Sequence, residues 1–504
     1  MRATSLAACG ATLACPTLAF AEDRPTEGGL WSFDVTDQVE SWEEPTQTVR
    51  VHYSIGGPNV TRLEDLDEDG VPDFAQDVAE RTAESVALFV SLGFRPPVPE
   101  SAIETELGGS PALDVYLVDF GGAADGRFGV DGCGNEGCAG FYVIENDFAG
   151  YGYATVEEGI TTVTSHEIFH GVQAAYNFVP TWLSEGTAVW AERQFDPDSA
   201  DFIHQCGGLL ADPGRPIYQP PGGPVAAFAY GTGLWFDFLS ERHDASIVVE
   251  LLEALVDDSA AEAPELVFEG LLAAHDDDLE TAWASFARYN LAAGFRSGVA
   301  TSHPYAGRLD AIKADAEGEV IALDARFFPL AANYYNLQHP GGDAWFVADA
   351  ALEDVAFSLH PVGDFAADGA VGDPIATWSV DAPSAQMIYE DLPAGGYWIV
   401  GARTAVAEGS ARANVCASAD PADPRCPQLD SDSTSSSGGG SSSDSSGGEP
   451  DDEGSTSGTT GIISSGDTQE PTASGAPQGC GCRSTTPAPP LFLLVFLSLL
   501  RRRP

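Results

Sequence analysis

The pentapeptide His166-Glu167-Ile168-Phe169-His170 restricts the fold of this chain more than any other feature. Residues four apart share one face of an α-helix, so both imidazoles can reach one metal ion only if this stretch is helical. The spacing of apolar residues predicts helices over 156–176 and 182–194. Glu167 then lies beside an open coordination position, where a carboxylate can take a proton from zinc-bound water. The alternative is a helix with two ordinary surface histidines.

A zinc site of this kind needs a third protein ligand. Gln173 and Tyr176 stand three and six residues after His170, where the metzincin extension would place Gly and His, so the ligand must come from elsewhere. Glu185 follows a helix break and begins a new helix, from which its carboxylate can face the two imidazoles. The alternative for Glu185 is a helix-capping glutamate.

Two further residues are candidates for supporting roles. Glu192 lies seven residues after Glu185 on the same helical stripe, where it can orient a ligating histidine by a hydrogen bond or remain a solvated surface residue. Hydrolysis of an amide also needs a donor for the oxyanion, and Tyr230 precedes an apolar helix predicted over 234–239. The alternative for Tyr230 is a tyrosine that faces the core.

These motifs resemble those of known peptidase families. The segment W-L-x-E-G-x-A at 182–188 resembles the third-ligand segment of gluzincins. The stretches H-E-x-x-H-x-V-Q at 166–173 and P-x-W-L-x-E-G-T-A at 180–188 resemble those of secreted metallopeptidases of myxobacteria and related bacteria. The resemblance implies a zincin-like α+β catalytic domain, Glu185 as zinc ligand, Tyr230 as oxyanion donor, and hydrolysis of peptide bonds.

An acidic loop precedes the first long helix, which is predicted over 74–91. It carries four aspartates at near-alternating positions: Asp65, Asp67, Asp69 and Asp73. Oxygens in this pattern, with Gly70 permitting the sharp turn, predict a calcium site. Gln76 stands where a full EF-hand has Glu, so the loop resembles the shorter calcium loops of extracellular repeats. The alternative is a solvated acidic turn.

The two ends of the chain predict export. Residues 1–21 combine a charged start, a small-residue apolar stretch and an A-x-A cleavage site, which is typical of a signal peptide. Residues 429–478 are almost entirely polar and small, which predicts a flexible stalk. Residues 479–504 hold a Cys motif, a short apolar run and an Arg cluster, and resemble the C-terminal sorting tail of myxobacterial surface proteins. That resemblance implies attachment to the outer cell surface by an anchoring machinery.

Export permits disulfides, and the cysteine spacing suggests two local ones. Cys133 and Cys138 flank a Gly-rich turn, and Cys416 and Cys426 flank a Pro/Asp-rich turn, so each pair is expected to be bridged. Cys206 is left over, and we expect it to be buried and unreactive.

The segment between the signal peptide and the stalk divides into two predicted domains. Residues 22–318 read as strands followed by helices, which favours an α+β class. The predicted strands of this domain are 49–55, 113–118 and 141–144. Residues 319–428 alternate apolar and polar residues between turns, as at 344–348, which predicts an all-β sandwich as an accessory domain.

The charge balance narrows the choice of partners. The chain has 77 acidic against 22 basic residues, a formal charge of -55, which disfavours nucleic acid and anionic membranes. The leading hypothesis is therefore a surface-displayed zinc peptidase whose edge strand, expected at 141–145, holds an extended protein or peptide substrate. No G-x-M-E-N amine anchor is present, which favours an endopeptidase. The rival is a non-catalytic surface binding or adhesion protein with a structural zinc, in which Glu167 would have no use.

Overall fold

The computed structural model describes residues 21–29, 31–103, 107–218, 227–294, 302–362, 371–380, 386–404 and 409–427. The predicted signal peptide (apart from Ala21), the stalk and the sorting tail lie outside these ranges. Within them, no helix combines the length and the apolar character that crossing a membrane requires. Helices and mixed sheets are both present, so the chain is of the α+β class.

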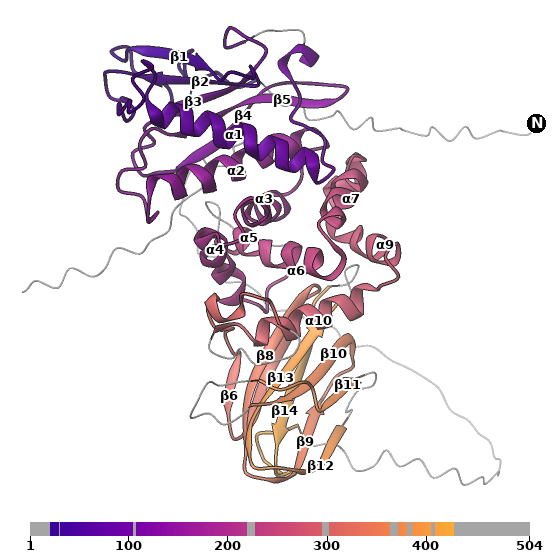
Figure 1. Ribbon diagram of the computed structural model, residues 1–504. Coiled ribbons are helices and arrows are strands. Elements are labelled where there is room, and N and C mark those ends of the chain that lie inside the picture. The colour runs from indigo at the N-terminus through magenta and orange to yellow at the C-terminus, as the bar shows by residue number, and fades with distance from the viewer. Residues whose placement is uncertain are drawn as a thin grey trace, which may run out of the picture. The chain divides into compact units, whose positions relative to one another are not determined.

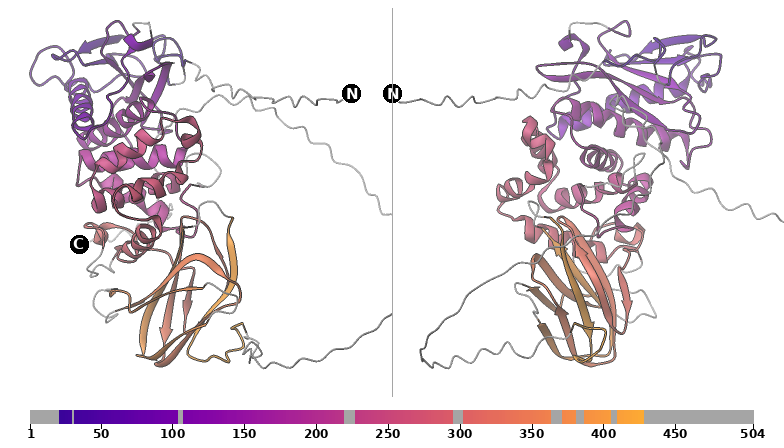
Figure 2. Two further views of the ribbon diagram at one scale, coloured as in Figure 1. Left: turned by 90° about the vertical axis from the view of Figure 1, so that its right-hand side faces the viewer. Right: turned by 180° about the vertical axis from the view of Figure 1, so that it is seen from behind.

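The first region is built on a five-stranded sheet in the order β1-β2-β3-β5-β4. Its strands are β1 (Val39–Glu43), β2 (Val49–Ser54), β3 (Leu113–Val118), β4 (Gly126–Gly134) and β5 (Gly137–Glu145). The three central strands β2, β3 and β5 run parallel, and the two outer strands pair antiparallel. Helices α1 (Asp73–Ser91) and α2 (Val156–Ala174) cover one face of this sheet (Figure 1), as two other directions also show (Figure 2).

The expected edge strand over 141–145 is wrong. These residues belong to β5, which pairs with β3 on one side and β4 on the other, so β4 is the outer strand. The sequence hides β4 because its glycines have low strand propensity. The structure uses those glycines for close packing: a Cβ at Gly129 would lie 2.4 Å from the ring of Phe141.

A group of helices follows the sheet in sequence. They are α3 (Thr181–Phe195), α4 (Ala200–Leu210), α5 (Ala227–Gly231), α6 (Gly233–His243), α7 (Ser246–Ala254), α8 (Asp258–Glu262), α9 (Phe268–Ala273) and α10 (Leu279–Leu291). Helix α3 packs against α2 and α6, and its Trp182 and Trp190 are almost completely buried. The ring of Trp190 packs on Phe169 of α2 and that of Trp182 on Phe236 of α6. Because tryptophan buries a large apolar area, these contacts fix α3 against both helices.

The second region consists of strands in two sheets that enclose their own apolar cluster. The strands are β6 (Ala316–Gly318), β7 (Ile321–Phe327), β8 (Ala331–His339), β9 (Gly342–Ala348), β10 (Leu352–Pro361), β11 (Ala376–Val380), β12 (Gln386–Leu392), β13 (Gly395–Arg403) and β14 (Ala411–Ser418). Their order is β11-β10-β13-β8-β6 in one sheet and β12-β9-β14-β7 in the other. Strand β6 pairs with β8, so the sheet begins three residues before the boundary expected at 319.

Each region contains one disulfide. Cys133 and Cys138 are bridged across the β4–β5 hairpin, and Cys416 of β14 is bridged to Cys426. Cys206 on α4 has a free thiol and is buried.

Candidate metal centre

Helix α2 carries the H-E-x-x-H pentapeptide in its second half. The helix begins at a cap in which the side chain of Thr155 accepts a hydrogen bond from the backbone N–H of Glu158, at 3.0 Å. Contacts with the sheet, α1 and α3 then bury all its residues from Thr162 to its end. His166, Glu167 and His170 are at most 4% exposed, so they are not surface residues.

His166, His170 and Glu185 come together. One ligand atom from each lies within 4.8 Å of the others, and Glu185, in the first part of α3, is fully buried. Its Oε2 lies 3.2 Å from Nε2 of His166 and 3.7 Å from Nε2 of His170. Two imidazoles and one carboxylate are a donor set that suits zinc and leaves a fourth position open. Nε2 of His170 is buried with no hydrogen-bond partner among the described residues, which fits an atom that binds a metal.

Glu192 supports His166 from the side opposite to this group. The residue lies on α3, is 2% exposed, and places Oε1 2.7 Å from Nδ1 of His166. A carboxylate on the second ring nitrogen orients a histidine toward a metal on the first.

Gln173 makes the corresponding contact with His170, and the sequence analysis gave it no role. Its Oε1 lies 3.0 Å from Nδ1 of His170, and its Nε2 donates to the carbonyl of Ser184. The signal that could have identified it is its spacing, because residues three apart share a helix face.

The two histidines differ in their charge preference. Burial lowers the pKa of His166, but hydrogen bonds to Glu185 and Glu192 outweigh it and raise that pKa well above the ordinary value. Burial also lowers the pKa of His170 and prevails there, bringing it to about 4. Burial raises the pKa of Glu192 to about 8. His170 is therefore neutral at neutral pH, whereas His166 must give up a proton before its Nε2 can bind a metal, so metal binding at this site releases a proton.

Strand β4 approaches the centre through Gly126. A Cβ at this position would lie 2.5 Å from Cγ1 of Val163 and 2.9 Å from Oε1 of Glu167, so only glycine permits this contact. The preceding Asp125 is 1% exposed and accepts a hydrogen bond from the hydroxyl of Tyr153 at 2.6 Å. The outer strand of the sheet therefore runs directly past Glu167.

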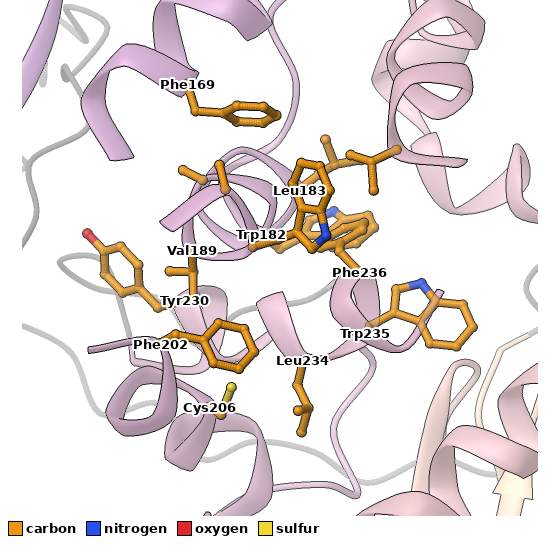
Figure 3. Packing of buried hydrophobic residues seen from close by; sticks show 14 of the residues in the cluster. Phe169, Trp182, Leu183, Val189, Phe202, Cys206, Tyr230, Leu234, Trp235 and Phe236 are labelled. Atoms are coloured by element: carbon orange, nitrogen blue, oxygen red, sulfur yellow. The ribbon is translucent and has the colours of Figure 1, made fainter. Parts of the chain in front are cut away.

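The ring of Tyr230 lies next to the ring of His166. The two rings have centroids 5.9 Å apart, and the tyrosine is 3% exposed. Figure 3 shows its ring at the border of an apolar cluster, with the hydroxyl pointing away from Val189 and Phe202. The hydroxyl thus points away from these two apolar side chains.

The acidic loop before α1 forms a second group of carboxylates. Oxygens of Asp65, Asp67 and Asp73 lie within 4.8 Å of one another. Asp69 is not in this group, and its carboxylate accepts hydrogen bonds from the backbone N–H of Val71 and from Nε2 of Gln76. Three carboxylates at this separation could hold a hard cation such as calcium.

Comparison with the models of known protein families finds no match. Comparison with curated proteins also finds none. Among solved structures, PliG of Aeromonas hydrophila, a periplasmic inhibitor of g-type lysozyme, is 16% identical, with 20% of this chain and 84% of its own covered and a TM-score of 0.16. PliG of Salmonella Typhimurium is 13% identical, with 21% and 98% covered and a TM-score of 0.15. Scores this low carry no argument about fold or function.

Proposed function

We propose that this protein is a zinc-dependent peptidase with its active site at His166, His170 and Glu185. The observation that carries the proposal is that one ligand atom of each of these residues lies within 4.8 Å of the others. Glu167, which is fully buried, stands between the two histidines in the sequence. A site that only stabilised the fold has no need of a carboxylate next to the metal ligands. The presence of Glu167 therefore favours hydrolysis over the rival of a binding protein with structural zinc.

Each side chain of the proposed site has its own role in the hydrolysis of a peptide bond. Zinc, when bound, supplies Lewis acidity that polarises the substrate carbonyl and acidifies a water. Glu167 takes the proton of the attacking water on its carboxylate and returns it to the departing amine. Tyr230 donates a hydrogen bond to the developing oxyanion. Glu192 holds the ring of His166 in place through Nδ1.

The substrate is an extended protein or peptide segment, and β4 offers the edge along which it binds. β4 is the outer strand of its sheet, and its first residue, Gly126, lies against Glu167. The backbone N–H of Glu22 already donates to the carbonyl of Val130 further along β4, so we place the peptide on the part of the strand next to Gly126. Main-chain pairing with such an edge holds a peptide across the centre. We infer a zincin-like catalytic domain and, without an amine anchor, an endopeptidase. Export and attachment to the outer cell surface follow from the resemblance of the chain ends and are part of this proposal.

The replacement Glu167→Gln tests the proposal, because it removes the proton acceptor and leaves the three ligands intact. We expect zinc to remain stoichiometric while hydrolysis of a mixed protein substrate falls by about 10²–10⁴-fold. Metal analysis and a cleavage assay on the same samples measure both quantities.

Glu145→Gln is the matched control. Glu145 is a second buried carboxylate of the same domain, and it binds Tyr151 and the backbone of Phe120 instead of the centre. This control should keep its activity. A Glu167→Gln protein that cleaves within a few-fold of the parent would refute the peptidase assignment, and a parent that binds zinc without cleaving anything would support the binding-protein rival.

A further inference from the structure

We propose that Gln173 is a positioning residue that fixes the tautomer of His170 and ties α2 to α3 beside Glu185. The inference rests on the proposed function, since it concerns how the zinc ligands are held. Gln173 is 4% exposed, and the structure brings its amide into contact with three other buried side chains: His170, Ser184 and Thr187.

The hydrogen-bond partners of Gln173 determine where the oxygen and the nitrogen of its side-chain amide lie. Its Nε2 lies 2.8 Å from the carbonyl oxygen of Ser184, which can only accept a hydrogen bond. It also lies 2.8 Å from Oγ1 of Thr187, whose own hydrogen is directed to the carbonyl of Leu183 at 2.8 Å. The opposite orientation would place the amide oxygen against two acceptors. The NH₂ group therefore faces α3, and the oxygen faces His170.

The orientation of the amide in turn fixes the proton on His170. An amide oxygen only accepts, so the ring nitrogen 3.0 Å away, Nδ1, must donate and must carry the hydrogen. The hydroxyl of Ser184 lies 3.3 Å from the same Nδ1 and 2.9 Å from the amide oxygen. It donates to the nearer amide oxygen, which leaves Nδ1 as the donor to Gln173. A neutral imidazole has one hydrogen, so Nε2 keeps its lone pair, and this is the nitrogen that faces Glu185.

The same amide also positions the third ligand. Ser184 and Thr187 lie on either side of Glu185 on α3, and both bind Nε2 of Gln173. One side chain of α2 therefore holds a histidine of its own helix and the backbone next to the carboxylate of the neighbouring helix. Removing it should disturb two of the three ligands together.

A nitrogen-15 spectrum of the zinc-free, histidine-labelled full-length protein tests the tautomer without any variant. We expect His170 to carry its proton on Nδ1, whereas imidazole in water prefers Nε2. A His170 protonated on Nε2 in the parent would overturn the inference. This measurement does not involve catalysis, so it stands even if the peptidase proposal fails.

Zinc affinity, measured by competition with a chelator, tests the consequence. Gln173→Met keeps the length of the side chain and removes its hydrogen bonds, so zinc binding should weaken by about 10–100-fold. Gln173→Glu keeps the acceptor for His170 but turns an oxygen toward Ser184 and Thr187, so it should restore the Nδ1 proton of His170 without restoring full affinity.

Asn290→Leu is the control. Asn290 is another buried amide that binds a histidine, because its Oδ1 lies 3.0 Å from Nε2 of His303. Neither residue is one of the candidate ligands. It should leave zinc affinity unchanged. Folded Gln173→Met that binds zinc as tightly as the parent, or an equal loss in Asn290→Leu, would overturn the positioning role. A parent that binds no zinc would instead refute the proposed function.

Discussion

The centre at His166 and the acidic loop at Asp65 each gather ligand atoms within 4.8 Å, yet the two sites are built differently. In the centre every ligand is buried, and the ring nitrogens that face away from it are held by Glu192 and Gln173. In the loop the carboxylates are exposed or half-buried. Distance alone therefore does not distinguish a buried site from one that is exposed to solvent.

The difference lies in what satisfies the polar atoms. Carboxylates of the loop accept hydrogen bonds from the loop's own backbone, as Asp65 does from Gly70 and Asp73 from Leu66. Gly70 supports this turn with a φ of 92°, which favours glycine. The donors and acceptors of the centre are almost completely shielded from bulk solvent, so the loss of one member leaves its partners unsatisfied. Changes in the centre should cost more than changes in the loop.

The largest effect is expected from Glu185→Ala. Two imidazoles alone hold zinc poorly, so this replacement should abolish stoichiometric binding and exceed the ~100-fold loss typical of outer residues. Equilibrium dialysis followed by metal analysis measures it. Stoichiometric zinc in purified Glu185→Ala would show that another residue is the third ligand. It would then contradict the assignment of the site to His166, His170 and Glu185.

A smaller effect is expected from Glu192→Ala, which leaves all three ligands but frees Nδ1 of His166. Zinc affinity should fall by about 10–100-fold, because the ring loses its orienting partner. Glu192→Gln restores a hydrogen-bond acceptor without the charge and should recover part of the loss. If Glu192→Ala lost zinc entirely while Glu185→Ala kept it, the roles of the two glutamates would be exchanged.

The smallest effect is expected in the loop. Calcium at a few tens of times its dissociation constant should stabilise the parent by about 2 kcal/mol, a rise of a few degrees in melting temperature for a domain of this size. Asp67→Ala should remove this rise, and Asp69→Ala, outside the group, should retain most of it. Thermal melts with calcium and with a calcium chelator measure both. If the parent melts at the same temperature in both conditions, the loop does not bind calcium and is only an acidic turn.

Much of the local structure was predictable from the sequence. The predicted strand at 113–118 is β3, and the helices expected over 74–91 and 156–176 match α1 and α2 to within two residues. The four-residue spacing of His166 and His170 placed both on one helix face before any contact was known. Such features depend on periodicity within about 20 residues, which a sequence displays directly.

Tertiary structure decided the features that join distant residues. It placed the glycine-rich β4 at the sheet edge, where the sequence favoured 141–145, because strand order depends on pairing partners and not on strand propensity. It also gave Gln173 its contacts across α2 and α3, which arise only when the two helices lie side by side. The sequence by itself determined which residues can bind a metal. The packing of α3 and β4 against α2 determined how these residues are oriented, because hydrogen bonds across a core depend on positions that only the folded chain brings together.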